Sequence, residues 1–587
     1  MHPPHDIDAS LILWISSRAE QVEGSHTLTQ ENQNLQRILD NALQHHQNGR
    51  FSEAEQIYRR ILAINPRHPD CLHLLGMIAY QAGSFETAAD MIREAIVLNS
   101  SGTSYYANLG TVLQAQGKLE EAEILYRQAL TLKPDLAEVH VNLGNVLQAR
   151  GELSSSVACY ERALALKPAC AEIHNNLGNT RQKQGQMEAA ISCYERALSI
   201  KPDYAEVYYN LGNACRDQDK LDEAVTRYQE ALTINPEYAE AYYNLGNVLR
   251  EQGKLEDALA KYGEALMLRP NYGKAGFGEA LAQLLQGDFT TGWANFERRW
   301  QSADHDTPKR AYPEPAWVGE KLSSGGLLLW GEQGIGDEIM FAGLIPDVTR
   351  TGNRSILDCD ARLKPLFTRS FPGVNVVSGC GPGSHPELEI ASQLPIGSLP
   401  GLFRTTSSAF AATTSPYLIA NPAASKRLRA RYDDGRRLVG LAWYTKSSKT
   451  GRVRSIDLAL LAPLFTRPDI HWVSLQYGDP GMLENQAAAA GAPILIDRAV
   501  DQLSDLDIFA AQIAAMDLVI TIDNSTAHLA GALGVPVWVL LPFAPDWRWL
   551  LRREDCPWYP TMRLFRQTEP GNWKSVVEKV RRNLLVL

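Results

Sequence analysis

The sequence predicts an array of paired helices followed by two lobes in which short strands alternate with helices. Three observations predict this fold class. A Leu-Gly pair recurs every 34 residues in the first half of the chain, short apolar runs replace that period after about residue 325, and a polar turn follows a strand at two later points. The predicted segments are a poorly ordered tail (1–34), about seven repeats (35–270), a degenerate capping repeat with a linker (271–323), the first lobe (324–415), an inter-lobe linker (416–436), the second lobe (437–570) and a terminal helix (571–587).

Composition narrows the class of protein. The chain has 587 residues, is 45% hydrophobic and carries a net charge of −10. An acidic chain lacks the basic surface that nucleic acids require, so we expect no nucleic-acid partner. No apolar run reaches the roughly 18 residues of a membrane helix, and the first residues do not resemble a signal peptide. Eight cysteines without a CxxC pair are typical of reduced thiols, so we expect a cytoplasmic protein.

The Leu-Gly pairs define the repeats. They begin at Leu75, Leu109, Leu143, Leu177, Leu211 and Leu245. Prolines share the period at positions 66, 134, 168, 202, 236 and 270, with Ser100 in the one gap, and alanines recur where two helices would cross. This pattern resembles the tetratricopeptide repeat, in which each unit is a pair of antiparallel helices and the units stack into a superhelix.

Asparagines flank the Leu-Gly pairs on both sides. The row before them comprises Asn108, Asn142, Asn176, Asn210 and Asn244, and the row after them comprises Asn145, Asn179, Asn213 and Asn247. The first helix of each unit lines the concave wall, and side-chain amides there can hold an extended peptide backbone without reading its side chains. We therefore predict a protein or peptide partner in this groove. The alternative is that asparagine merely suits a solvated groove.

Two turns in the second half of the chain are candidates for ligand binding. Gly334 and Gly336 precede Asp337 in a glycine-rich turn after the strand-like run Leu327-Leu-Leu. The second turn, beginning at Asp523, follows the apolar run Leu518-Val-Ile-Thr-Ile. In open α/β sheets such turns present backbone N–H groups to ligands. Two lobes, each with such a turn, predict a cleft between them.

These motifs carry a family resemblance. The chain from about residue 324 onward resembles the two-lobed, Rossmann-like (GT-B type) glycosyltransferases related to the lipopolysaccharide heptosyltransferases. The matching motifs are Gly334-Ile-Gly336-Asp337, Asp523-Asn-Ser-Thr-Ala-His528 and Ala530-Gly-Ala-Leu-Gly-Val-Pro536. The whole layout also resembles bacterial repeat proteins that carry this module, and the O-linked N-acetylglucosamine transferases. The resemblance implies a glycosyltransferase that uses a nucleotide-sugar donor.

Asp337 is the candidate catalytic base. Glycosyl transfer requires a group that takes the proton from the acceptor hydroxyl, and a carboxylate on a turn facing the cleft fits that role. The resemblance implies the same role. The alternative is that Asp337 only caps its helix, which aspartate does well. Glu338 is the nearest competitor for the role of base.

The candidate donor site lies in the second lobe. Asp523, Asn524, Ser525, Thr526 and His528 form the turn and the first residues of a helix whose N–H groups could bind a diphosphate. The alternative is again capping, with His528 packed or on the surface. The heptosyltransferase pattern usually has glycine at the position of Ser525, so this chain departs from it there.

A basic loop after the first strand of the second lobe could neutralise the leaving diphosphate. Its candidate ligands are Lys446, Lys449, Arg452 and Arg454, and Gln476 after the next strand could meet the base or ribose. Asp358 and Asp360 have the spacing of a metal-nucleotide motif, but we expect no metal and no cofactor besides the donor. For Trp547 and Trp549 we favour core packing over sugar stacking.

The sequence therefore predicts a metal-independent, inverting glycosyltransferase whose repeats guide an acceptor. The sugar, the nucleotide and the acceptor stay open, and the acceptor could be a protein, a lipid-linked sugar or a polysaccharide. The main alternative is a non-catalytic interaction scaffold whose transferase-like module is inactive or senses a nucleotide. An oxidoreductase is disfavoured, because no Gly-x-Gly-x-x-Gly turn with an acidic residue about twenty positions later is present.

Overall fold

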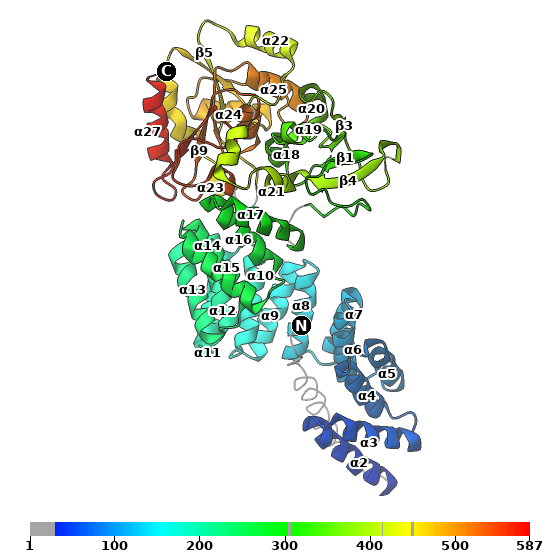
Figure 1. Ribbon diagram of the computed structural model, residues 1–587. Helices are drawn as coiled ribbons and strands as arrows, with labels where there is room; N and C mark the ends of the chain where they lie inside the picture. Colours follow the sequence, from blue (N-terminus) through cyan, green and yellow to red (C-terminus); the bar gives the residue numbers. More distant parts are fainter. Residues whose placement is uncertain (1–29, 303–306, 385, 414, 448–450, 587) are drawn as a thin grey trace. The chain divides into compact units, whose positions relative to one another are not determined.

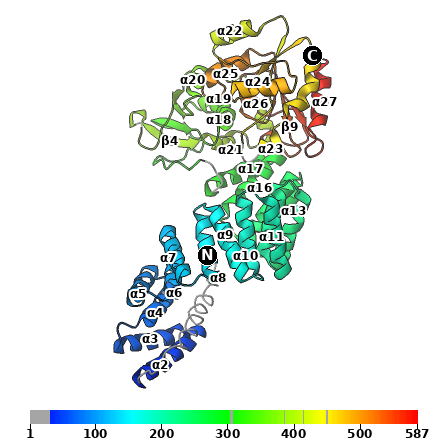
Figure 2. The same ribbon diagram turned by 180° about the vertical axis from the view of Figure 1, so that it is seen from behind.

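The computed structural model describes residues 30–302, 307–384, 386–413, 415–447 and 451–586 (Figures 1 and 2). Most of the predicted tail, residues 1–29, lies outside this range. The chain divides into two compact units, Met1–Pro236 and Glu237–Leu587. The last full repeat and the capping repeat therefore group with the lobes, whereas the sequence places the end of the repeat region at residue 270.

The first unit consists of antiparallel helix pairs, so the tetratricopeptide prediction is confirmed. Its helices are α2 (Gln30–Gln47), α3 (Phe51–Ile64), α4 (Pro69–Gln81), α5 (Phe85–Leu98), α6 (Thr103–Ala115), α7 (Leu119–Leu132), α8 (Ala137–Ala149), α9 (Leu153–Leu166), α10 (Ala171–Lys183), α11 (Met187–Ile200), α12 (Ala205–Asp217) and α13 (Leu221–Ile234). The alanines predicted at the crossings are fully buried, because only a small side chain allows the helices to approach.

From the second Leu-Gly pair onward, the glycine packs on a tyrosine ring of the second helix in its repeat, whereas Gly76 of the first pair packs on Ile92. A β-carbon at Gly144 would lie 2.8 Å from the ring of Tyr160, and one at Gly178 would lie 2.5 Å from the ring of Tyr194. Both tyrosine rings are buried. Glycine therefore recurs here because no other residue leaves room for the ring.

The second asparagine row bonds to these same tyrosines. The hydroxyls donate to the asparagine Oδ1 atoms fifteen residues earlier, in the pairs Tyr160–Asn145 (2.6 Å), Tyr194–Asn179 (2.7 Å) and Tyr228–Asn213 (2.7 Å). The pair Tyr262–Asn247 (2.8 Å) repeats the bond in the second unit. This row therefore holds the two helices of these repeats together, a structural role that was not predicted from the sequence.

The second unit begins with two further helix pairs. They are α14 (Ala239–Glu251) with α15 (Leu255–Leu268), and α16 (Gly273–Gln286) with α17 (Phe289–Phe296), followed by the 3₁₀ turn η2 (Glu297–Gln301). The predicted capping repeat corresponds to α16, α17 and η2. Its aromatic residues Phe289, Trp293 and Phe296 are buried in the same core as the two lobes.

The first lobe is a four-stranded parallel sheet of order β3-β2-β1-β4. Its strands are β1 (Gly326–Trp330), β2 (Ser355–Asp358), β3 (Asn375–Val377) and β4 (Ile390–Pro395). The surrounding helices are α18 (Ile335–Ala342), α19 (Ile345–Arg350), α20 (Lys364–Ser370), η3 (Pro386–Leu388), η4 (Ile396–Ser398), α21 (Pro400–Phe403) and η5 (Ser407–Ala412). Strand β1 is buried along its whole length, as expected for a central parallel strand.

The second lobe is a six-stranded parallel sheet of order β10-β9-β8-β5-β6-β7. Its strands are β5 (Arg437–Ala442), β6 (Ile470–Ser474), β7 (Ile494–Leu495), β8 (Leu518–Ile522), β9 (Val537–Leu541) and β10 (Met562–Arg566). Its helices are α22 (Pro422–Tyr432), α23 (Gly451–Arg454), η6 (Leu458–Thr466), α24 (Pro480–Ala489), α25 (Leu506–Ala514), α26 (Ser525–Ala532), η7 (Trp547–Trp549) and α27 (Trp573–Leu584). Numbered within this lobe, the strands have the doubly wound order 3-2-1-4-5-6.

One predicted boundary differs from the structure. The predicted inter-lobe linker contains α22, which Asn421 caps by accepting a hydrogen bond from Ala424 N (3.1 Å). Tyr432 at its end donates to Asp497 Oδ2 (2.7 Å) and so fixes the helix to the second lobe. The small and polar residues of this segment are typical of a linker, but Asn421 followed by Pro422 is also a typical start of a helix.

Candidate functional site

The two predicted turns both leave the carboxyl ends of central parallel strands. The turn with Asp337 follows β1, where the strand order of the first lobe reverses, and the turn with Asp523 follows β8, beside β5 at the reversal in the second lobe. Ligands of open α/β sheets bind at such reversal points. The topology therefore brings each turn to the expected edge of its sheet.

The helices after these turns, α18 and α26, pack against each other. A β-carbon at Gly336 would lie 3.2 Å from Cδ2 of His528 and 3.7 Å from Cα of Ser525. Glycine at position 336 thus allows the first lobe to approach the start of α26. The sequence predicted these residues in one cleft, and the structure brings them into contact.

Asp337 occupies the first turn of α18 and has two partners. Its Oδ2 accepts a hydrogen bond from Gly334 N (3.2 Å), which is the capping interaction that the alternative interpretation expected. Its Oδ1 accepts a hydrogen bond from Nη2 of Arg548, a residue of the second lobe. The carboxylate therefore caps its helix and also ties the two lobes together.

Arg548 belongs to a chain of alternating charges. Its Nη1 donates to Asp546 Oδ1 (2.6 Å), and Asp546 Oδ2 lies 3.4 Å from Nη2 of Arg454. Nη1 of Arg454 lies 3.2 Å from Oδ2 of Asp523. The chain runs from Asp337 across the lobe boundary to the turn after β8. Arg454, one of the predicted basic residues, joins the two turns in this way.

These pairings shift the ionisation of the carboxylates. Burial alone would raise the pKa of Asp546, but the positive charges of Arg548 and Arg454 outweigh it and lower that pKa to about 2. Burial raises the pKa of Asp523 above its usual value, and Arg454 opposes this rise. Asp546 is therefore ionised at neutral pH, whereas burial disfavours the ionised form of Asp523.

His528 is buried and uncharged at neutral pH. Burial, followed by the charge of Arg548, lowers its pKa to about 3. Its Nδ1 lies 3.0 Å from the hydroxyl of Tyr559, and its ring stacks on Trp549 at a centroid distance of 5.1 Å. A phosphate at this ring would thus meet a neutral imidazole and not a positive charge. Trp547 and Trp549 are buried, as the sequence analysis favoured.

The remaining predicted residues of α26 form its start. Asn524 caps the helix through a hydrogen bond from Ala527 N to its Oδ1 (3.3 Å), and Thr521 Oγ1 donates to the same oxygen (3.0 Å). Ser525 is half-buried and Thr526 is buried. Asn524 therefore caps α26, as the alternative interpretation expected. Ligand contact by this turn stays a prediction.

The loop after β5 is described in part, and ligand contact by its basic residues stays a prediction. Lys446 and Arg452 are exposed, and Lys449 lies outside the described residues. Gln476 is buried, and its Oε1 accepts from Trp443 N (2.9 Å) and Tyr444 N (2.8 Å). Its Nε2 donates to the carbonyls of residues 444 and 477 (both 3.1 Å), so its amide holds this loop, and its contact with a ligand remains untested.

The other acidic residues of the first lobe have structural partners. Glu338 Oε2 accepts from Asp360 N (2.9 Å), and burial raises the pKa of Glu338 to about 7. Asp358 pairs with Arg310, and Asp360 pairs with Arg362 (2.8 Å). Among the described residues, no group of three or more His, Cys, Asp or Glu side chains gathers in the manner of a metal site.

A buried ion pair was not predicted. Arg299 of η2 donates from Nε and Nη2 to the two carboxylate oxygens of Glu332 (both 2.9 Å), and both side chains are fully buried. Glu332 also accepts from Gly397 N (3.0 Å). Because Glu332 precedes Asp337 in the glycine-rich turn, the capping repeat anchors that turn directly. In the sequence, Glu332 stands in the turn that begins Trp-Gly-Glu, but no motif or spacing indicated Arg299 as its partner.

The first asparagine row is less uniform than the second. Asn108 is buried and its Nδ2 lies 2.7 Å from His73 Nε2. Asn176 and Asn210 are half-buried and donate to asparagines of the preceding repeat, at 3.4 Å and 2.9 Å. Asn142 and Asn244 are also half-buried. The row therefore keeps partial exposure in its middle members, and peptide binding by it stays a prediction.

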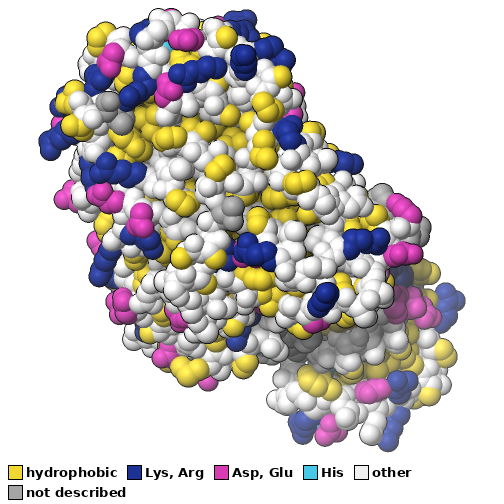
Figure 3. Space-filling model, turned by 45° about the horizontal axis from the view of Figure 1, so that its top comes forward, with side chains coloured by type: hydrophobic (Ala, Val, Ile, Leu, Met, Phe, Trp, Pro, Cys, Tyr) yellow, Lys and Arg dark blue, Asp and Glu magenta, His cyan; other side chains and the backbone are white. Residues whose placement is uncertain are grey.

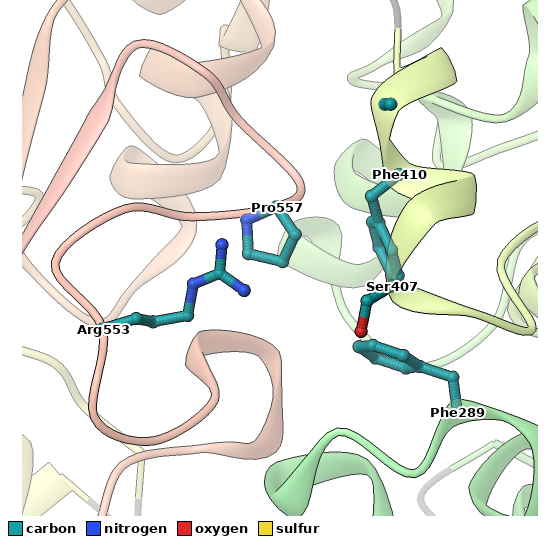
Figure 4. A pocket seen from close by; sticks show the side chains of 6 residues that line it. Phe289, Ser407, Phe410, Arg553 and Pro557 are labelled. Atoms are coloured by element: carbon teal, nitrogen blue, oxygen red, sulfur yellow. The ribbon is translucent and has the colours of Figure 1, made fainter.

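The second unit also contains a cavity of about 270 Å³ that the sequence did not predict (Figure 4). Phe289 comes from α17, Ser407 and Phe410 from η5, and Arg553 and Pro557 from the segment after η7. The guanidinium of Arg553 extends toward Pro557 in Figure 4. The cavity shares no residue with the chain of charges that starts at Asp337.

The surface carries charges of both signs. On the face shown in Figure 3, lysine and arginine side chains are interspersed with aspartate and glutamate, with hydrophobic patches between them.

Within the part of the chain that the structure describes, no helix combines the length and apolar character needed to cross a bilayer.

Comparison with known families identifies the repeats. A model described as TPR repeat matches residues 113–151, 144–185, 183–215 and 212–249, and models described as tetratricopeptide repeat match 45–109 and 239–272. These repeats are protein-interaction scaffolds, so this part of the chain supports protein–protein interaction.

A curated relative and several solved structures are similar to parts of the chain. Protein FlbA of Caulobacter vibrioides is 33% identical over 326 residues, which cover 52% of this chain and 54% of FlbA. The chain thus spans about half the length of that relative. YrrB, described as a TPR protein with an unusual peptide-binding site, is 24% identical, with a TM-score of 0.27 and coverage of 32% of this chain and 96% of its own. PilF of Pseudomonas aeruginosa is 19% identical, with a TM-score of 0.33 and coverage of 35% and 95%.

Proposed function

We propose that the protein is a metal-independent glycosyltransferase of the GT-B type, with a nucleotide sugar held by the second lobe and an acceptor recruited by the repeats. The observation that supports it best is the contact between Gly336 and His528. This contact brings the turn of the candidate base to the start of α26, which would bind the donor diphosphate. Two such turns in one cleft suit a reaction between two substrates.

The reaction would be a single inverting displacement. The acceptor oxygen forms a bond to the anomeric carbon, and the bond from that carbon to the phosphate oxygen breaks, so that the nucleoside diphosphate leaves with the electron pair. Asp337 takes the proton of the acceptor hydroxyl. The N–H groups of α26 and the guanidinium of Arg454 would stabilise the negative charge of the leaving group.

The acceptor would be a protein, because grooves of helical repeats bind peptides. The half-buried asparagines Asn142, Asn176 and Asn210 are the proposed contacts with its backbone. A lipid-linked sugar or a polysaccharide would enter the same cleft without using these asparagines. Loss of transfer in a variant with all three replaced by Ala would therefore point to a protein acceptor.

The test is a panel of sugar nucleotides incubated with the pure protein in the presence of a metal chelator. Release of the nucleoside diphosphate would be measured for the native protein and for Asp337→Asn. We expect release from one donor in the native protein and a large loss in the variant. Absence of release from every donor, or equal release by the two proteins, would overturn the proposal.

A non-catalytic scaffold is the second candidate, and the state of Asp337 favours it. Both carboxylate oxygens of Asp337 already accept hydrogen bonds, from Gly334 and from Arg548. A module that only senses a nucleotide would keep this arrangement. Tight binding of a sugar nucleotide without release under any acceptor condition would favour this candidate over the transferase.

A further inference from the structure

The pairing of Asp337 with Arg548 limits how an acceptor hydroxyl can approach the carboxylate. A base needs a free lone pair that faces the acceptor hydroxyl. In this structure Oδ2 of Asp337 accepts from Gly334 N, and Oδ1 accepts from Arg548. A guanidinium that binds another anion would leave more of this carboxylate open to the acceptor.

Arg548 is held in a way that allows it to change partners. Asp546 accepts hydrogen bonds from its Nη1 (2.6 Å) and from its backbone N (3.1 Å), so the residue stays anchored when Asp337 is released. The side chains of Arg548 and Asp337 are 13% and 17% exposed, so the pair keeps some contact with solvent. Leu550, two residues later, has a φ of 54°, a conformation that non-glycine residues rarely adopt.

The position of Arg548 suits an anion bound at α26. His528, in that helix, is close enough for the charge of Arg548 to help lower its pKa. Arg548 and Arg454 flank the same carboxylate, Asp546, so two guanidinium groups converge beside the start of α26. Guanidinium groups bind phosphate oxygens with paired, charge-assisted hydrogen bonds.

We propose that Arg548 is a ligand of the donor diphosphate, and that Asp337 holds it until the donor binds. Donor binding then draws Arg548 away from Asp337 and leaves one carboxylate oxygen free to accept the proton of the acceptor. The inference rests on the proposed function and adds a residue and an order of events to it. The base would become available only after the donor is in place, which disfavours reaction before the site is filled.

The capping repeat supports the segment that carries Arg548. Trp547, the preceding residue, packs against Trp293 of α17 at a centroid distance of 5.3 Å and against Phe296 at 5.9 Å. The guanidinium of Arg548 lies 4.5 Å from the ring of Trp547. The backbone of this segment is therefore fixed by a packed core, and only the end of the arginine side chain has to move.

Competition between Asp337 and the donor can be measured without turnover. The experiment is calorimetric titration of the full chain with the nucleoside diphosphate of the preferred donor, and with the same nucleoside lacking phosphates. If Asp337 competes for Arg548, then Asp337→Asn should bind the nucleoside diphosphate about 5- to 150-fold more tightly than the native protein, the usual range for coupled binding. Affinity for the nucleoside should not change.

A matched control separates competition from a general effect of losing a carboxylate that pairs with an arginine. Asp347 pairs with Arg404 in the first lobe, with Nη2 and Oδ2 2.9 Å apart, and both side chains are buried. Asp347→Asn removes the same chemical group from a buried arginine away from the cleft. We expect it to leave the affinity for the nucleoside diphosphate unchanged.

A second variant tests Arg548 itself. Arg548→Lys keeps the positive charge but loses the paired hydrogen bonds, so the protein should fold while its affinity for the nucleoside diphosphate falls about tenfold or more. The gain from Asp337→Asn should shrink in the Arg548→Lys background, because the two residues act on one ligand.

The outcomes separate this inference from the proposed function. Equal or weaker binding of the nucleoside diphosphate by Asp337→Asn overturns the inference while leaving a donor site in place. An equal gain in the native and Arg548→Lys backgrounds also overturns it. If neither the native protein nor any variant binds a nucleoside diphosphate, the proposed function fails and the inference fails with it.

Discussion

Polar side chains are used differently in the repeats and in the lobes. In the repeats, Tyr194 bonds to Asn179 fifteen residues earlier, and the same bond recurs in neighbouring units. In the lobes, Asp337 and Arg548 are separated by 211 residues. The repeats thus use one local contact again and again, whereas the lobes also use long-range pairs that occur once.

The same contrast holds for ion pairs. Arg162 and Asp135 of the repeats are 51% and 65% exposed, so water screens their attraction. Arg299 and Glu332 are fully buried, so each charge depends on the other. A change of one residue should therefore have a small, local effect in the repeats and a large effect in the second unit.

The largest effect is expected for Arg299→Met. It leaves the carboxylate of Glu332 buried without its ion-pair partner, and breaking a buried pair costs about 3–5 kcal/mol. Urea unfolding followed by tryptophan fluorescence measures this loss in the second unit, because Trp14 is the only tryptophan before residue 237.

The matched change in the repeats is Arg162→Met, for which we expect a loss of less than about 1 kcal/mol, measured from urea unfolding followed by far-ultraviolet circular dichroism. Equal losses in the two variants would contradict the contrast between exposed and buried pairs.

The next effect concerns turnover. Asp337→Asn should lower sugar transfer at least about 10²-fold, the lower end for loss of a positioned base, while the protein stays folded. Initial rates with the preferred donor and acceptor measure it, and Asp347→Asn serves as the control. Transfer at the native rate would remove Asp337 from the mechanism.

A smaller effect distinguishes the two asparagine rows. Asn145→Ala removes the acceptor of the Tyr160 hydroxyl, so we expect a loss of about 1–2 kcal/mol. Hydrogen exchange of α8 and α9, followed by mass spectrometry, should show faster opening of this repeat. Asn142→Ala should change it by less than about 0.5 kcal/mol, since surface changes away from packed contacts have little effect. A larger loss for Asn142 would make the first row structural as well.

The smallest effect is a dependence on pH. Because the pKa of His528 falls from 6.5 to about 3 on folding, the unfolded chain binds a proton first and stability decreases as pH drops below about 6.5. This single group should cost about 1 kcal/mol between pH 7 and pH 5.5. His528→Gln should lose that part of the slope, measured by urea unfolding with tryptophan fluorescence. An unchanged slope would mean that folding does not shift the pKa of His528.

Much of the architecture could be predicted from the sequence because the signals are local. The 34-residue spacing of Leu109, Leu143 and Leu177 reflects helix length and helix packing, which neighbouring residues determine. Strand-length apolar runs likewise indicate parallel strands, and the turns at Asp337 and Asp523 follow directly from them. The alternation of strands and helices also predicts parallel sheets, in which each turn lies at the carboxyl edge of its own sheet.

The sequence by itself determined the repeat architecture, the two α/β lobes and the two turns, because each depends on residues close together in the chain. Only the tertiary structure decided the partners of these turns. Arg548 meets Asp337, and Arg299 meets Glu332, through the closure of lobes and the docking of the capping repeat. No spacing in the chain encodes such pairs, since burial and charge complementarity select them only after the elements have packed.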